Sequence, residues 1–136
     1  HQMCLAVQYL HKQMIVHRDI KLENFLLKSN GTVILSDLGV AKILSHSREI
    51  QTSIVGTMEY IPPEMFEKSR DVSLPSDIYS LGVCLFALYM NKLLLEDLEG
   101  NCEEEAKGLV NFSPVQDVSD DIEDLVIEML DVRHEY

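Results

Sequence analysis

The chain has 136 residues, with 23 acidic and 11 basic side chains and a formal net charge of −12. This charge disfavours nucleic acid and anionic lipid as partners, and a solvated acidic surface is its plainest explanation. The longest apolar run, residues 81–90, is far shorter than the roughly 20 residues that span a bilayer, so we expect no membrane insertion. Three scattered cysteines without a CxxC pair favour a reducing, intracellular compartment, the cytoplasm first and the nucleus second.

The first part of the chain predicts a helix, a loop and a hairpin. Residues 1–10 follow a helical apolar pattern with no capping signal before it, which leads us to expect that the natural chain begins earlier. A short β-prone run at residues 14–16 precedes the sequence HRD at residues 17–19, which we therefore place on a loop. Two apolar runs flank a Ser-Asn-Gly sequence suited to a turn with positive φ, so residues 25–35 predict a β-hairpin.

The second part of the chain predicts a long loop followed by helices. Residues 41–56 show no sustained period, which indicates a loop long enough to need a functional reason. A short helical stretch is expected around residues 64–67, and a longer helix opens at Pro75 and stays apolar on nearly every side through Met90, which marks it as buried. The last helix is expected to start at Asp120 with a capping box. The predicted fold is mainly α with a small β-hairpin.

Polar residues that suit phosphoryl transfer gather around this loop and hairpin. The hairpin would return Asp37 to the side of Asn24, and both offer oxygens of the kind that Mg²⁺ takes when phosphate oxygens and waters complete its shell. Lys21 can offset charge on a phosphoryl group, and Asp19, with an ordinary pKa of about 3.9, can orient a hydroxyl and accept its proton late. Each residue alone has a plainer explanation, such as a turn former, a surface charge or, for His17, a packed loop histidine.

Taken together, the motifs resemble the C-terminal lobe of a eukaryotic protein kinase, nearly end to end. HRD at residues 17–19 with Asn24 matches the catalytic loop, and DLG at residues 37–39 stands where that family has DFG. Gly-Thr at residues 56–57 and PPE at residues 62–64 match the end of the activation segment, although Pro63 replaces an alanine. Residues 77–82 resemble the start of the DxWSxG helix. Five motifs in the right order make chance an unlikely source.

The resemblance implies roles for the matching residues. Asp19 would be the catalytic base, Lys21 would contact the γ-phosphate of ATP, and Asn24 and Asp37 would hold Mg²⁺. Asp77 would be a buried anchor that accepts hydrogen bonds from the catalytic-loop backbone. Lys21 together with Thr57, which we count among the catalytic residues, resembles the serine/threonine branch, with diffuse similarity to Aurora-like and calmodulin-dependent-like groups.

The same resemblance implies regulation and substrate preference. Arg18 would pair with a phosphate on Thr52 or Ser53, the alternative being that these two are ordinary loop hydroxyls. Glu23 stands where basophilic members recognise a substrate arginine, so we hypothesise protein substrates with basic motifs. Glu64 would pair with an arginine that family spacing puts just beyond residue 136.

The 136 residues contain no Gly-rich phosphate loop, no strand lysine and no helix with the glutamate partner of that lysine. We therefore interpret residues 1–136 as a partial protein kinase domain without its N-terminal lobe, inactive by itself. Two functions follow. The first is a serine/threonine kinase that uses ATP and Mg²⁺ when the domain is complete, and the alternative is a noncatalytic kinase-like scaffold, or pseudokinase, that binds protein partners.

Overall fold

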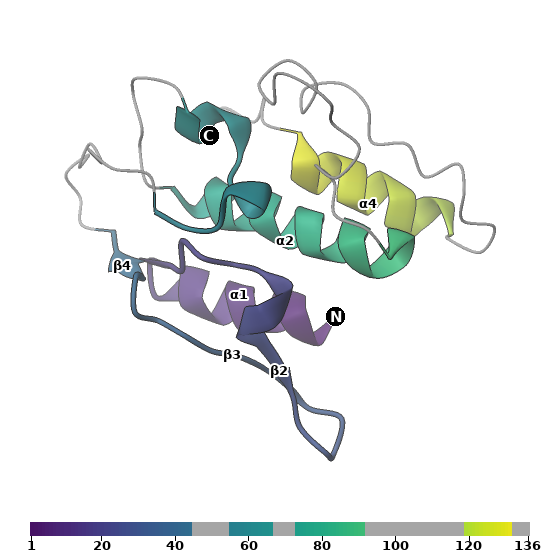
Figure 1. Cartoon of the computed structure of the whole chain (residues 1–136), viewed down its shortest axis with the longest axis horizontal. Coiled ribbons are helices and arrows are strands. Elements are labelled where there is room, and N and C mark those ends of the chain that lie inside the picture. The colour runs from purple at the N-terminus through teal and green to yellow at the C-terminus, as the bar shows by residue number, and fades with distance from the viewer. Residues whose placement is uncertain (45–54, 67–72, 92–118, 132–136) are drawn as a thin grey trace.

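The computed structural model describes residues 1–44, 55–66, 73–91 and 119–131. Within this part of the chain the α-helices are α1 (Gln2–Lys12), α2 (Leu74–Met90) and α4 (Asp120–Leu130). The strands are β1 (Ile15–Val16), β2 (Phe25–Leu27), β3 (Val33–Leu35) and β4 (Lys42–Ile43), and short 3₁₀ helices cover Leu22–Asn24, Met58–Tyr60 and Pro63–Phe66. Figure 1 shows α2 in the middle of the molecule, with α4 along one side and α1 and the strands on the other.

Helix α2 is the buried centre that its sequence predicts. Pro75 lies in its first turn, where a missing N–H costs nothing, and Asn91 ends it in the left-handed conformation with φ 53°. Most of its middle is buried, including Leu81, Val83, Cys84 and Phe86. Helix α4 lies close against it because Gly82 has no side chain: a Cβ there would be 3.0 Å from the Cβ of Met129.

Helix α4 starts at Asp120, as predicted, but its capping differs from the prediction. Ser119 is the N-cap, and no side chain of the described residues makes a capping hydrogen bond there. The backbone N–H groups of Ile122 and Glu123 instead donate to the carbonyl of Ser119. The predicted capping box at Asp120 and Glu123 is therefore wrong. The acidic residues of this first turn still favour the helix, because negative charge suits the positive end of the helix dipole.

The predicted hairpin is confirmed. Strands β2 and β3 pair antiparallel with Phe25 opposite Leu35 and Leu26 opposite Ile34, and Gly31 in the turn has φ 81°. Phe25 and Leu35 pack against the core, whereas Leu26 and Ile34 on the other face are exposed. The register thus follows the apolar alternation, since a slip by one residue would exchange the two faces.

A second pairing was not predicted. Strand β4 runs antiparallel to β1, with Ile15 opposite Ile43 and Val16 opposite Lys42. The expectation of a loop from residue 41 onward is therefore wrong for residues 42–43, while residues 45–54 lie outside the described part. Two residues are too few to show a period, and their partner strand lies far away in the sequence.

Candidate active site

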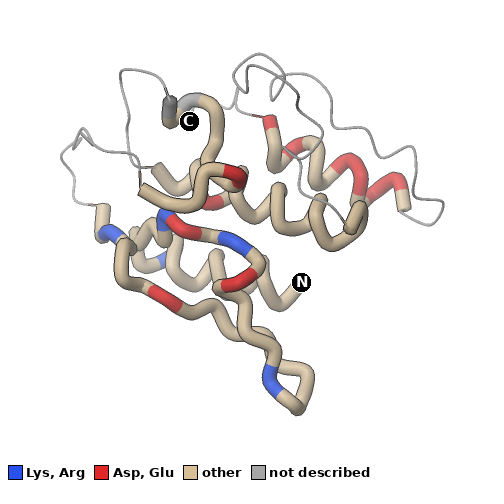
Figure 2. Tube along the Cα trace, viewed as in Figure 1, with Lys and Arg blue, Asp and Glu red and all other residues tan. Residues whose placement is uncertain are grey.

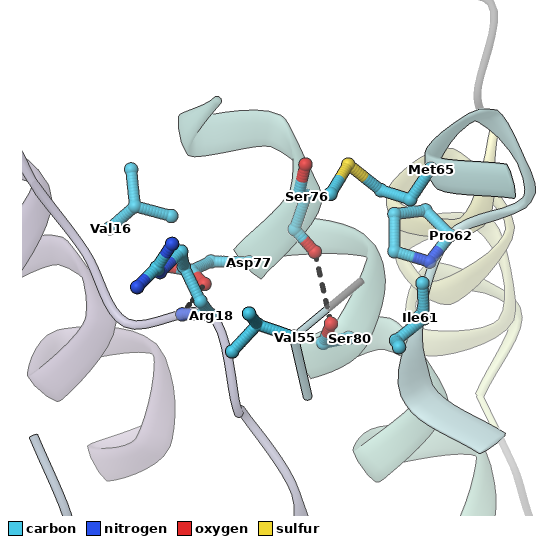
Figure 3. A pocket seen from close by; sticks show the side chains of 9 residues that line it. All are labelled: Val16, Arg18, Val55, Ile61, Pro62, Met65, Ser76, Asp77 and Ser80. Atoms are coloured by element: carbon cyan, nitrogen blue, oxygen red, sulfur yellow. Dashed lines mark hydrogen bonds between the residues drawn. The ribbon is translucent and has the colours of Figure 1, made fainter. Parts of the chain in front are cut away.

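Asp77 joins the HRD loop to the central helix. Its carboxylate accepts hydrogen bonds from the backbone N–H of His17 (2.8 Å, to Oδ2) and of Arg18 (2.9 Å, to Oδ1), and only 1% of the residue is exposed. Figure 3 shows Asp77 on α2 beside Arg18. Arg18 has φ 69°, a conformation that is strained for a bulky residue and persists only where neighbours hold it. Asp77 supplies that hold, through the contact that the sequence led us to expect.

His17 is fully buried and in one tautomer. Its Nδ1 accepts the backbone N–H of Asp19 at 3.3 Å, so the ring proton must lie on Nε2, which donates to the carbonyl of Ser36 at 3.0 Å. The neutral ring thereby links the loop to the residue that precedes Asp37. Its position fits the plainer explanation of a packed loop histidine, one that fixes the distance between two polar segments.

Asp19, Lys21 and Thr57 form a closed triangle of side chains. Asp19 Oδ2 lies 2.9 Å from Lys21 Nζ, the Thr57 hydroxyl donates to Asp19 Oδ1 at 2.9 Å, and Lys21 Nζ donates to Thr57 Oγ1 at 2.8 Å. The side chains of Asp19 and Lys21 are 14% and 23% exposed. A carboxylate and an ammonium group therefore meet at the surface, held by a hydroxyl from a segment more than thirty residues away.

This triangle sets the charges of both ionisable groups. Burial raises the pKa of Asp19, but hydrogen bonds from Lys21, Thr57 and Asn24 together with the Lys21 charge outweigh it, so the pKa lies below its ordinary 3.8. The hydrogen bond to Asp19 raises the pKa of Lys21 above 10.5, with further attraction from Glu23 and Asp37. At neutral pH the site therefore holds a carboxylate beside a cation.

Asn24 and Asp37 are brought together through Ser36. The Ser36 N–H and hydroxyl both donate to the Asn24 carbonyl, at 2.8 and 3.0 Å, so Asp37 directly follows a residue fixed on Asn24. The Asn24 amide N–H₂ donates to the backbone carbonyl of Asp19 at 2.7 Å and to its Oδ2 at 3.3 Å. This fixes the amide of Asn24, which is 7% exposed, and leaves its Oδ1 without a hydrogen-bond donor among the described residues.

These oxygens fit a magnesium ion that also binds phosphates. Asp37 is exposed and has φ 61°, and its Oδ1 accepts the N–H of Gly39 at 3.1 Å. Within the described ranges no three His, Cys, Asp or Glu side chains gather to hold a metal by themselves. A hard amide oxygen and one carboxylate suit Mg²⁺, which keeps waters and takes phosphate oxygens rather than an all-protein shell.

Comparison with known proteins shows which family the chain belongs to. Residues 1–136 match the family described as "Protein kinase domain". The chain belongs to the protein kinase family. An Aurora kinase of Debaryomyces hansenii is 34% identical over 131 residues, which cover 96% of this chain and 32% of that protein. The cell cycle serine/threonine-protein kinase CDC5/MSD2 of Saccharomyces cerevisiae is 35% identical over 132 residues, which cover 95% of this chain and 19% of that protein.

A third relative, the serine/threonine-protein kinase Nek3 of Mus musculus, is 44% identical over 87 residues, covering 64% of this chain and 17% of that protein. The chain thus spans about a third or less of the length of these curated relatives. Their descriptions confirm the serine/threonine branch of the kinase family, and the partial kinase fold is consistent with three helices and small antiparallel sheets in the described part.

Of the remaining predicted residues of the kinase site, the structure describes some and not others. Arg18 donates from Nε to the carbonyl of Val40, and Glu23 is exposed on the short helix that follows Lys21. Thr52 and Ser53 lie outside the described residues, as does the side chain of Glu64. The regulatory pairing expected of Arg18 therefore stays a prediction.

Gly56 shapes the site, although the sequence pointed to it only as part of the Gly-Thr motif and gave it no role of its own. It has φ 116°, and a Cβ on it would lie 2.6 Å from the backbone carbonyl oxygen of Arg18. Only glycine can therefore pass this point and deliver Thr57 to Asp19. The Gly-Thr pair carried the signal, but spacing alone does not show that the glycine passes the catalytic-loop backbone.

Two more residues missing from our predictions connect the segment after Thr57 to α2. The Ser80 hydroxyl donates to the carbonyl of Tyr60 at 2.7 Å. It also lies 3.0 Å from the carbonyl of Ser76, a contact drawn in Figure 3. Tyr60 is buried, and burial raises the pKa of its phenol to about 12, so it stays neutral. The hydrogen bond from Ser80 to Tyr60 therefore holds the segment after Thr57 against α2.

Beside them lies a cavity of about 20 Å³, room for about one water molecule. Its lining comes from β1, the HRD loop, residues 55–65 and α2: Val16, Arg18, Val55, Ile61, Pro62, Met65, Ser76, Asp77 and Ser80. A cavity this small cannot take a substrate.

Proposed function

We propose that this chain is the C-terminal-lobe part of a serine/threonine protein kinase that transfers the γ-phosphoryl group of ATP to protein hydroxyls. The observation that carries the proposal is the Asp19 carboxylate, ionised and held between Lys21 at 2.9 Å and Thr57 at 2.9 Å. A carboxylate with a purely structural role would need no more than these two partners. Asp19 also keeps part of its surface open to solvent, near Asn24 and Asp37, whose oxygens suit Mg²⁺.

Asp19 would act on the substrate hydroxyl. Its lowered pKa makes it a weak base, so its main contribution is to orient the hydroxyl and to accept the proton late, as the new oxygen–phosphorus bond forms. The hydrogen bond from Thr57 holds Oδ1, and Lys21 holds Oδ2, so the carboxylate has little freedom to rotate. Such positioning is worth a large share of the barrier when reacting atoms are held in contact.

Lys21 would neutralise the phosphoryl group that is being transferred. An ammonium group carries three N–H donors, and two of those on Lys21 go to Asp19 and Thr57. The remaining donor can meet a phosphate oxygen near the Asp19 carboxylate. The raised pKa keeps Lys21 charged through any physiological pH, as this role requires.

Asn24 and Asp37 would hold Mg²⁺ through the amide Oδ1 and the carboxylate. When bound, the ion would neutralise charge on the ATP phosphates. The fixed amide of Asn24 and the tie from Ser36 supply the preorganised part of this site. The groups that would cover ATP from the opposite side lie outside residues 1–136, so we expect these residues alone to be inactive.

The proposed partners are proteins with basic residues near the target hydroxyl. Glu23 is exposed and lies close enough to Lys21 to raise its pKa, which puts a carboxylate beside the reaction centre. The net charge of −12 also favours cationic partners. Use of ATP assigns this activity to the inside of the cell. None of the helices in the described ranges is long and apolar enough to cross a membrane.

The test uses the full natural protein that contains this segment, with Mg-ATP and a basic serine peptide. Asp19→Asn keeps the shape but removes the proton acceptor, and we expect kcat to fall by about 10²–10⁴-fold. Asp124→Asn, an exposed carboxylate on α4, is the matched control and should leave kcat unchanged.

Unchanged transfer in Asp19→Asn would refute the role of this carboxylate. A parent protein that transfers no phosphate yet binds protein partners would favour the noncatalytic scaffold.

A further inference from the structure

His11 belongs to none of the kinase motifs, yet its ring reaches the anchor of the catalytic loop. It lies in the last turn of α1, and its Nε2 is 3.0 Å from Asp77 Oδ2. Since a carboxylate oxygen can only accept here, Nε2 carries the proton and donates. The His11 side chain is 14% exposed and that of Asp77 1%, so the contact is shielded from solvent.

We propose that His11 is a positioning residue for the phosphoryl transfer, acting on the catalytic loop through Asp77. The inference rests on the proposed kinase function. His11 touches none of the reacting groups; it fixes the carboxylate that fixes the backbone in front of Asp19.

The first reason is that a buried carboxylate needs donors. Asp77 has three in the described residues: His17 N–H and His11 Nε2–H on Oδ2, and Arg18 N–H on Oδ1. A charge left short of donors in a buried site is costly, and its strongest bonds are those to ionised oxygens. Without His11, Oδ2 would keep a single donor.

The second reason is where the donors come from. The N–H groups of His17 and Arg18 belong to the catalytic loop, which Asp77 itself holds in place. They therefore cannot independently fix the orientation of the Asp77 carboxylate. The terminal torsion of an aspartate is broad and soft, so the carboxylate needs an outside reference. His11 is on α1, which packs against α2, and thus holds the carboxylate independently of the loop.

The third reason is that the loop needs this hold. Arg18 has φ 69°, and Asp19 follows it directly. A strained residue relaxes when its partners loosen, and relaxation at Arg18 would turn Asp19 away from Lys21 and Thr57. A displacement of about 1 Å at a reacting group can cost 10²-fold in rate.

A purely structural role has a matched control on the same helix turn. Lys12 also places a basic side chain in the last turn of α1, where its positive charge interacts favourably with the negative end of the helix dipole. Lys12 is exposed, so Lys12→Ala removes that effect and leaves Asp77 untouched.

The experiment measures kcat, KM and backbone amide exchange in the full natural protein, with unfolding by denaturant as the stability check. We expect His11→Ala to lower kcat by roughly 10-fold to 100-fold with little change in KM for peptide or ATP. Mass spectrometry of peptides covering residues 15–19 should show faster exchange at His17 and Arg18. His11→Gln restores an N–H donor at similar reach and should recover most of kcat and the slow exchange. Lys12→Ala should match the parent protein.

His11→Ala with parent kcat and parent exchange would overturn the inference, as would a loss of stability alone with kcat of the folded protein intact. His11→Gln that fails to recover kcat would also overturn it, because the hydrogen bond would not be the cause. A parent protein without phosphoryl transfer would overturn the proposed function and the kinetic claim together, whereas faster exchange in His11→Ala would still establish the contact with Asp77.

Discussion

The catalytic loop at residues 17–24 and the hairpin at residues 25–35 adjoin in the sequence but are held in different ways. The hairpin turn is held locally: Gly31 N–H donates to the Lys28 carbonyl at 2.9 Å, and Lys28 N–H donates to the Thr32 carbonyl at 2.9 Å. Its tip is exposed, with Leu27 at 74%. The amide of Gln2 on α1 adds contacts to the backbone of Gly31 and Val33.

The catalytic loop takes its hydrogen bonds from distant segments. Its partners are Ser36 after β3, Thr57 near the end of the activation segment, and Asp77 on α2. His17 is fully buried and Asn24 is 7% exposed. Figure 2 shows the loop as the place where acidic and basic residues alternate along the chain next to α2. A loop bound by three distant segments can hold strained residues in place, whereas a loop held mainly by its own turn holds them less firmly. Backbone changes should therefore be costly around the first loop and cheap in the second.

The largest effect in this comparison is expected for Gly56→Ala. The new Cβ would lie 2.6 Å from the backbone oxygen of Arg18, and alanine resists φ 116°. The strained conformation alone costs about 1–3 kcal/mol, and the backbone contact forces a further shift that carries Thr57 away from Asp19. We expect a loss of stability beyond that range and a fall in kcat, measured by denaturant unfolding and steady-state kinetics. Parent kcat in this variant would show that the Gly56 passage does not set the site.

Thr57→Val should have the next largest effect. It keeps the volume but removes a hydroxyl that donates to Asp19 Oδ1 and accepts from Lys21 Nζ. Hydrogen bonds to charged groups contribute about 1.5–3 kcal/mol, so we expect kcat to fall by roughly 10-fold to 100-fold. Thr57→Ser retains the hydroxyl and should keep most of the activity; equal losses in both variants would point to packing rather than to the hydrogen bonds.

The pKa of Asp19 should respond to Lys21 and to no lysine of the hairpin. Burial raises this pKa, and Lys21 is the main group that reverses the effect, so Lys21→Met should move the pKa of Asp19 upward. Lys28→Met, on the exposed hairpin, is the control and should leave it unchanged. The measurement is an NMR titration of the Asp19 carboxyl carbon in both variants. A titration midpoint that Lys21→Met does not move would contradict the assigned cause.

The same pair makes stability depend on pH at both extremes. Because its folded-state pKa is lowered, Asp19 contributes stability that is present above 3.8 and is lost as pH falls through the lowered pKa. Because its folded-state pKa is raised, Lys21 contributes stability that is present below 10.5 and is lost as pH rises through the raised pKa. The difference in unfolding free energy between parent and Lys21→Met should therefore be constant near neutral pH and should shrink at either end.

What the sequence could predict follows the same division between local and distant causes. The hairpin, α1 and the buried α2 were predictable because turn residues and apolar periodicity lie within each segment. The predicted hairpin already suggested that Asp37 returns to Asn24, near Asp19 and Lys21, but the motif spacing that resembles a known family was needed to prefer these roles over plainer ones. Strand β4 was missed because its pairing partner is distant in the sequence.

Gly56 and His11 show where local reasoning ends. The need for glycine arises from the Arg18 carbonyl, and the use of His11 arises from Asp77, in both cases across a long stretch of chain. The capping box failed for the opposite reason: its local pattern was present from Asp120 to Glu123, but Ser119 is the N-cap, so Glu123 lies one position beyond the place where a capping box needs it.

The smallest effect is expected for Gly31→Ala at the hairpin tip. This glycine also has positive φ, 81°, but a Cβ there would meet nothing within 4 Å. Alanine in a left-handed conformation costs about 1–2 kcal/mol. The distant contact at this position, from Gln2, is to the backbone carbonyl of Gly31, which alanine keeps, so kcat should not change. Denaturant unfolding of Gly31→Ala and Gly56→Ala side by side separates the cost of a positive φ from the cost of the steric clash. Both variants have the unfavourable φ, and only Gly56→Ala clashes with the Arg18 backbone. If the two substitutions cost the same stability and both spare kcat, the catalytic loop is held no more tightly than the hairpin.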